Sequence, residues 1–421
     1  MTHQNKTKKT FLHIVLLVFV VFFVISFITN ILNSIISDVK ESFDLSLFLT
    51  GLLPFSFFIA YGVMSIPAGY LSEKYSTKRL LSLSFLFIAL ASFTFILFPG
   101  YLVFSFTLFI MGCCMAVLQV IINPMLRVAG GEDNFAFNSV MAQLVFGGAS
   151  FASPYLYMYL VNDKSDQAGL ANFVTSLVPE ELPWASLYVV FAFLALLLLV
   201  VVYLTKYPTF EKQEDERSGS KESYLGLLKN KWTLLYFFGI FSYVGVEQGI
   251  GNWISQFLNQ YHGLDPQTTG ANTVAYFWAM LTFGCLLGLV LLKIMDSRKL
   301  LIGASVLTMI CLVVALTGSA EVSPIAFAAL GFFISVMWSI IFSLGLNSVS
   351  SHHGSLSGIL CTGIAGGAIM PLIVGLIGDL SSLKVGLYFL LIPLGFILSI
   401  GFWAKPLITN KTISFKKPKA D

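Results

Sequence analysis

The chain has 421 residues, of which 57% are hydrophobic, 15% aromatic and only 11% charged. Soluble domains carry about 25% charged residues to cover their surface, so the composition excludes an ordinary soluble protein. The net charge of +3 comes from basic residues in short loops and tails, which excludes a basic surface for nucleic acid. Apolar runs of about 20 residues recur along the chain, each long enough to cross a bilayer as a helix. We therefore expect an all-α membrane protein.

Apolar runs separated by charges, Pro, Gly and Asn predict twelve membrane helices. The first run is too long for a signal peptide and lacks a small-residue cleavage site, so we expect it to remain as the first helix. The predicted helices lie near 11–36, 48–71, 80–98, 102–126, 136–161, 184–205, 232–258, 269–294, 300–318, 323–347, 355–379 and 385–403.

Most of the 24 Lys and Arg residues fall in alternate loops and in the two tails. Because such residues concentrate on the cytoplasmic side of membrane proteins, both termini are expected to be cytoplasmic. The one long polar connection is "KYPTFEKQEDERSGSKES" at 206–223. It predicts an N-terminal half at 1–206, a cytoplasmic linker at 207–230 and a C-terminal half at 231–421 with a short cytoplasmic tail.

The two predicted halves of six helices each also repeat weakly. "STKRLLSLS" after the second helix parallels "DSRKLLIGA" after the eighth, and "GGASFASP" parallels "GGAIMP". Two similar halves joined by a linker resemble the plan of the major facilitator superfamily, in which the substrate site lies between the halves at mid-membrane.

The stretch "YVGVEQGIGNW" at 243–253 places a carboxylate, Glu247, inside the seventh predicted helix. An ionised carboxylate at the bilayer centre costs roughly 3 kcal/mol or more unless it faces water or a partner. Glu247 could bind a coupling cation, or it could only hydrogen-bond a neighbouring helix. Helical spacing puts it in one arc with Gln248, Asn252 and Ser255, and the glycines permit close packing or a break in the helix. This polar face favours the first interpretation.

Amides and indoles in the other spans are the candidate substrate contacts. Amides offer donors and acceptors to sugar hydroxyls, and indole rings stack on the C–H face of a sugar. Each of them could instead tie helices together or anchor a helix at the membrane interface. The candidates are Asn33, Gln119, Asn123, Gln143, Gln248, Asn252, Trp278, Trp338 and Asn347.

Charged residues restrict the substrate further. No Lys or Arg lies deep in a predicted span, and a carrier of anions would normally place a cation at its site. The expected substrate is therefore neutral or cationic. Asp38, Lys40, Glu41 and Asp44 at the outer end of the first helix are expected to form a solvated rim.

Several stretches resemble the fucose permease and glucose/galactose transporter family over nearly the whole chain. They are "YVGVEQGIGNWISQFL", "GFFISVMWSIIFSLGLNSV", "GSLSGILCTGIAGGAIMPLIVGLIGD", "FDLSLFLTGLLPFSFFIAYGVMSIPAGYLSEKYS" and "NPMLRV". The resemblance implies cation-coupled uptake of a neutral hexose or a related sugar across a bacterial inner membrane.

The chain also departs from this family. Fucose permeases have acidic residues in the first and fourth helices, where this sequence has the amides Asn33 and Gln119. Cys285 stands where relatives often have Arg, and Ser339 where they have Pro. Glu247 is then the one intramembrane carboxylate left for coupling. Coupling to Na+, coupling to H+ through Glu247 and the absence of coupling all remain open.

The leading hypothesis is a sugar symporter that works by alternating access and functions as a monomer in membrane lipid. The coupling ion is H+ or Na+, and we expect no other cofactor, no structural metal, no nucleic acid and no enzymatic reaction. One alternative is a proton-driven exporter of cationic or amphipathic compounds with Glu247 as the counter-charge. The other is a membrane sensor that has a transporter fold and does not transport.

Overall fold

The computed structural model describes residues 11–130, 135–161, 169–207, 221–348 and 353–406. The described residues contain helices and no strand. The first part of the chain forms α1 (Leu12–Ser42), α2 (Leu47–Lys74), α3 (Thr77–Leu97), α4 (Tyr101–Gly130), α5 (Phe135–Val161), α6 (Leu170–Thr175), η2 (Pro183–Ala185) and α7 (Ser186–Leu204). Most of the predicted linker, 208–220, lies outside the described residues, and α8 (Lys221–Leu228) follows it.

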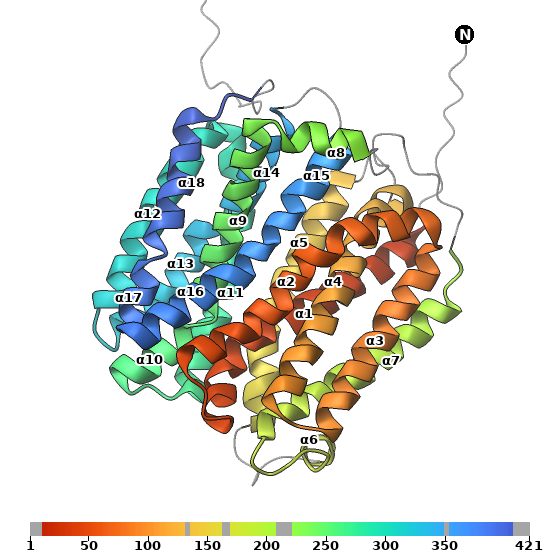
Figure 1. Cartoon of the computed structure of the whole chain (residues 1–421), viewed down its shortest axis with the longest axis vertical. Helices are drawn as coiled ribbons and strands as arrows, with labels where there is room; N and C mark the ends of the chain where they lie inside the picture. Colours follow the sequence, from red (N-terminus) through yellow and green to blue (C-terminus); the bar gives the residue numbers. More distant parts are fainter. Residues whose placement is uncertain (1–10, 131–134, 162–168, 208–220, 349–352, 407–421) are drawn as a thin grey trace, which may run out of the picture.

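The second part begins with α9 (Lys231–Gly251), α10 (Ile254–His262), η4 (Pro266–Gly270), α11 (Ala271–Ile294) and α12 (Ser297–Thr317). It continues with α13 (Val322–Ile334), α14 (Met337–Leu346), α15 (His353–Thr362), η5 (Gly363–Ala365), α16 (Gly366–Leu380), α17 (Leu383–Tyr388) and α18 (Leu391–Trp403). The long helices run along the molecule, and α1 begins at the end where α18 finishes (Figure 1). We call this the terminal end and the opposite one the distal end.

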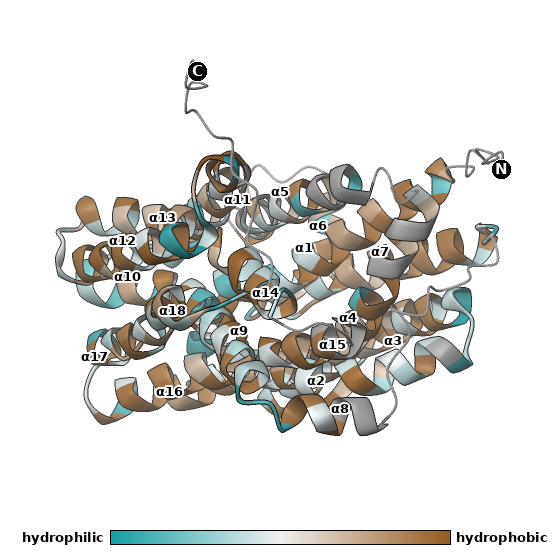
Figure 2. Ribbon diagram, turned by 90° about the horizontal axis from the view of Figure 1, so that it is seen from above, coloured by the Kyte–Doolittle hydropathy of each residue, from teal (hydrophilic) through white to brown (hydrophobic). Residues whose placement is uncertain are grey.

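Eleven helical stretches of the described residues are long and apolar enough to cross a membrane. The predicted helix at 232–258 is not among them. Its first part, α9, ends at Gly251, and α10 begins three residues later. Glu247, Gln248 and the glycines lower its hydropathy, so the segment that departs from an ordinary span is the one with the candidate site. Hydrophobic residues predominate along most of the other helices (Figure 2).

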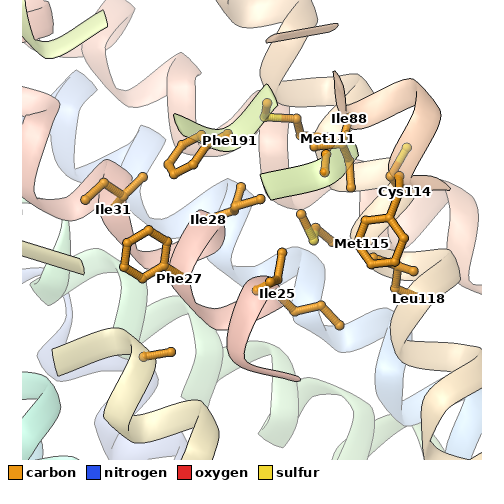
Figure 3. Packing of buried hydrophobic residues seen from close by; sticks show 14 of the residues in the cluster. Ile25, Phe27, Ile28, Ile31, Ile88, Met111, Cys114, Met115, Leu118 and Phe191 are labelled. Carbon is orange, nitrogen blue, oxygen red and sulfur yellow. The ribbon is translucent and has the colours of Figure 1, made fainter. Parts of the chain in front are cut away.

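Buried apolar side chains form two clusters, one centred on α1–α7 and one on α9–α18. In the first cluster Ile25, Phe27 and Ile28 of α1 face Met115 of α4 and Phe191 of α7 (Figure 3). A helix that is buried on nearly all sides must be apolar all round, which accounts for the near-continuous apolar sequence of α1. We refer below to the segment α1–α7 as the first half and to the segment α9–α18 as the second half.

The repeated loop motifs begin corresponding helices in the two halves. Ser76 opens "STKRLLSLS" and its side chain accepts a hydrogen bond from the amide of Arg79 at the start of α3. Asp296 opens "DSRKLLIGA" and accepts from the amide of Arg298 at the start of α12, at 2.8 Å. Both are ordinary N-cap interactions, so the weak repeat in the sequence has the same structural role in each half.

Candidate functional site

Glu247 lies on α9 beside two aromatic residues. One helical turn earlier, Tyr243 donates its hydroxyl to Oε1 of Glu247 at 2.8 Å. The ring of Tyr243 lies 6.0 Å from that of Trp338, at the start of α14, and Phe342 stacks on Trp338 at 5.7 Å. Tyr243 is buried, whereas Glu247 and Trp338 are partly exposed. We call Glu247, Tyr243 and Trp338 the Glu247 cluster.

No described basic residue pairs with Glu247. The ion pair found in the described part of the chain joins Arg298 to Asp296, at 3.1 Å, near the terminal end. The described residues also contain no set of three or more His, Cys, Asp or Glu side chains placed to hold a metal ion. The side chain of Glu247 therefore has a polar partner, Tyr243, but no counter-charge among these residues, and it retains the capacity to bind a small cation.

The end of α9 forms a second polar group with α1. Nδ2 of Asn252, the residue after α9, donates to the carbonyl oxygen of Gln248 at 2.7 Å. Asn33 of α1 packs against Gly251, where a Cβ atom would lie 3.1 Å from Nδ2 of Asn33. A larger residue here would require the amide of Asn33 to shift by a few tenths of an ångström. We call Asn33, Gln248 and Asn252 the Asn33 cluster.

The Asn33 cluster has unused hydrogen-bonding capacity. Nδ2 of Asn33 and Oδ1 of Asn252 are buried and have no hydrogen-bond partner among the described residues. A buried amide without a partner costs free energy, and a ligand hydroxyl that reached either atom would satisfy it. Because Asn33 belongs to the first half and Asn252 to the second, one ligand that reached both would join the halves.

The other predicted site residues are dispersed. Trp278 of α11 is buried, and its indole N–H has no partner in the described parts of the chain. Gln119 of α4 is half-buried, and Gln143 of α5 is exposed. Asn347 caps the end of α14, roughly 13 Å along the helix from Trp338. Asn123 lies in α4, but its side chain is outside the described residues.

The expected single polar arc of α9 is only partly present. Gln248 and Asn252 are buried, as expected for a face that is turned toward other helices. Ser255 does not continue this arc, because it belongs to α10, where its hydroxyl lies against Gly270. Since α9 ends at Gly251, the regular angular spacing does not extend to Ser255.

The prediction of a solvated rim is wrong for Asp38. Its side chain is 9% exposed and Oδ2 accepts from the hydroxyl of Tyr157 on α5 at 2.8 Å. The same oxygen accepts from Nε2 of Gln267 on η4 at 3.4 Å, which joins the halves at the distal end. Glu41 and Asp44 are exposed, as the sequence predicts.

Tyr243 was not among the predicted site residues, although the sequence contains a signal for it. Residues four apart on a helix are neighbours, so a Tyr four positions before an intramembrane Glu is a natural hydrogen-bond partner. The burial of Asp38 has no comparable local signal, because both of its partners are distant in the sequence.

Comparison with known proteins identifies the family. The sequence model of the Major Facilitator Superfamily matches residues 18–362. A glucose/galactose transporter of Brucella abortus is 30% identical over 349 residues, which cover 82% of each chain. The L-fucose-proton symporter of Escherichia coli is 26% identical over 365 residues, which cover 81% of each chain.

Solved structures share the fold. The fucose–proton symporter of Escherichia coli superposes with a TM-score of 0.67 at 21% identity, covering 94% of this chain and 100% of that chain. A bacterial homologue of the human lysosomal transporter Spinster, in an inward-facing and unoccupied conformation, gives 0.77 at 14% identity, covering 95% and 97%. The chain therefore belongs to the major facilitator superfamily, in the branch of the glucose/galactose transporters and fucose permeases, and is a transporter rather than an enzyme.

Proposed function

We propose that this protein is a secondary active transporter that takes up a neutral hexose, or a closely related sugar, together with H+ or Na+. Twelve spans in two six-helix halves, with both termini in the cytoplasm of a bacterium, would rock about a central site in the inner membrane. The proposal is supported by relatives that are described as a glucose/galactose transporter and as an L-fucose-proton symporter.

The coupling proposal rests on the arrangement of the Glu247 cluster. Glu247 lies in α9, bonded to Tyr243 and without a cationic partner among the described residues. A carboxylate in this position is more stable when it binds a proton or shares a Na+ with nearby oxygens. Glu247 is therefore the group assigned to the coupling cation, and a monomer contains every residue that this step requires.

The sugar would contact aromatic and amide side chains. The ring of Trp338 is partly exposed next to Glu247, and an exposed indole can stack on the C–H face of a hexose. The amide atoms of Asn33 and Asn252 that lack a partner within the described structure can bond hydroxyls from opposite halves. Sugar binding would draw the halves together, and this is the closing step that alternating access requires.

Uptake by the purified chain in proteoliposomes tests the proposal. Labelled glucose, galactose, fucose and a non-sugar control would be offered under a pH gradient alone, under a Na+ gradient alone and under neither. We expect at least one hexose to accumulate under one of the two gradients. Failure of every sugar to accumulate under either gradient would rule out the proposed symport.

A further inference from the structure

At the distal end, a carboxylate of the second half caps a helix of the first half. Oδ1 of Asp379, near the end of α16, accepts from the backbone amide of Leu47 at 2.8 Å, and Oδ2 accepts from that of Phe48 at 2.6 Å. Leu47 and Phe48 are the first two residues of α2, whose amides have no partner within their own helix. Ser46 caps only the next amide, that of Leu49, at 3.2 Å.

Small residues let α16 approach α2 closely beside this cap. A Cβ atom on Gly375 would lie 2.4 Å from the carbonyl oxygen of Leu47, and one on Gly378 would lie 2.7 Å from Cδ1 of Leu47. A Cβ atom on Gly51 of α2 would lie 3.0 Å from Cα of Leu372. The two helices, α2 and α16, run side by side where the halves meet (Figure 1). We call this contact the α2–α16 seam.

The seam also contacts the residue that follows the Asn33 cluster. Trp253, which follows Asn252, is fully buried and donates its indole N–H to the carbonyl oxygen of Pro371 at 3.3 Å. Its ring lies 3.2 Å from the position that a Cβ atom of Gly375 would occupy. One side chain therefore touches both the break after α9 and the helix that carries Asp379.

The two hydrogen bonds of Asp379 cannot survive separation of the halves at the distal end, because the acceptor is in one half and both donors are in the other. Bonds between a carboxylate and backbone amides are stronger than neutral ones, and the positive end of a helix favours a negative charge. The cap therefore favours the state in which the distal end is closed.

We propose that Asp379 is a gating residue of the transport cycle, which holds the distal end closed until its bonds to the first turn of α2 are released. The proposal rests on transport by alternating access, but it does not depend on which sugar or which ion is carried. It assigns to α16 a role in the opening step that is separate from cation binding at Glu247.

Alkylation of a buried cysteine measures opening of the seam directly. Thr50, next to Gly51 in α2, is 1% exposed, so Thr50→Cys should react with a maleimide only when the distal end opens. Mass spectrometry of the peptide that contains the introduced cysteine quantifies the reaction without removing the native cysteines. In this background Asp379→Asn should raise the alkylation rate roughly fivefold, because Asn loses the charge and one acceptor oxygen.

Asp296→Asn is the matched control. It makes the same change at another helix N-cap, but within one half and at the terminal end. It should leave the alkylation rate of the introduced cysteine unchanged. An equal rise in both variants would show a general loosening of the protein and would overturn the gating role.

A second pair of variants tests the donor side of the cap. Leu47→Pro removes the amide that donates to Asp379, at the first position of a helix, where Pro is best tolerated after an extended residue such as Ser46. Leu47→Ala loses most of the same side chain and keeps the amide. We expect faster alkylation of the introduced cysteine in Leu47→Pro than in Leu47→Ala. Equal rates would contradict the proposal, even if the Asp379→Asn protein could not be produced in folded form. Alkylation needs no sugar, so a failure of sugar uptake leaves this result interpretable.

Discussion

Replacing Glu247 with Gln changes the charge of the proposed coupling site and little of its geometry. Gln keeps an oxygen that can accept the hydroxyl of Tyr243, now placed 2.8 Å from Oε1. Bonds to charged groups contribute about 1.5–3 kcal/mol and neutral ones about 0.5–1.5 kcal/mol, so the fold should lose only about 1 kcal/mol. The variant should therefore accumulate in the membrane and bind sugar.

The effect on coupling should be much larger. One carboxylate carries one proton or helps to bind one Na+, and a tenfold cation gradient supplies about 1.4 kcal/mol, enough for roughly tenfold sugar accumulation. Gln has no proton to exchange in this range and no charge to attract Na+. The variant should therefore equilibrate sugar across the membrane without concentrating it.

Proteoliposomes separate the two activities. Net accumulation is measured under an imposed gradient, and exchange is measured with sugar on both sides and no gradient. Glu247→Gln should abolish accumulation and retain exchange, whereas Glu41→Gln, at an exposed acid outside the proposed site, should retain both. Accumulation by Glu247→Gln at the wild-type level would refute the assignment of the coupling cation to Glu247.

Three further predictions concern packing and charge. Gly251→Ala would press a Cβ atom against the amide of Asn33, so it should lower the melting temperature; adding Asn33→Ala should restore the melting temperature but not sugar uptake. The Cβ atom of Gly112→Ala would lie 2.1 Å from a carbonyl oxygen of α2, so this variant should destabilise the fold by about 1–3 kcal/mol or more. Gly303→Ala has open space around it and should instead stabilise α12 by roughly 0.5–1 kcal/mol. Thermal melts measure both changes. The hydrogen bond from the side chain of Arg298 holds the pKa of Asp296 below its usual range. The contribution of Asp296 to the stability of the fold is therefore present above the unfolded pKa of about 3.9 and is lost as the pH falls through the folded pKa. Asp296→Asn should lower the melting temperature at neutral pH, and the difference from the wild type should disappear on acidification.

The membrane-embedded helical fold follows from the sequence because bilayer thickness sets the length of each apolar run. The family was predicted from the long stretches that resemble it, and the matching family model and relatives confirm that prediction. The repeat of the two halves could also be read locally, since Ser76 and Asp296 open similar motifs and cap similar helices. These features depend on neighbouring residues alone, and sequence patterns capture them.

Features that depend on distant residues were not predictable from the sequence. Asp38 resembles a rim residue because charged neighbours follow it, yet Tyr157 and Gln267 cover it from other elements. Asp379 sits at the end of an apolar run, and its two donors are more than 300 residues away in the sequence. For the candidate site, the pattern indicated Glu247 and the break after Gly251, but not which helices would meet there.

The most direct test of the central claim is the current that follows a sugar jump. Proteoliposomes containing the purified chain would be adsorbed on a solid-supported membrane and exposed to a rapid step in glucose, galactose or fucose. If the protein moves a cation with sugar through Glu247, one of these sugars will produce a transient current of positive charge in the direction of sugar movement, and Glu247→Gln will not. Absence of current for every sugar, or an equal current in the variant, would contradict the account.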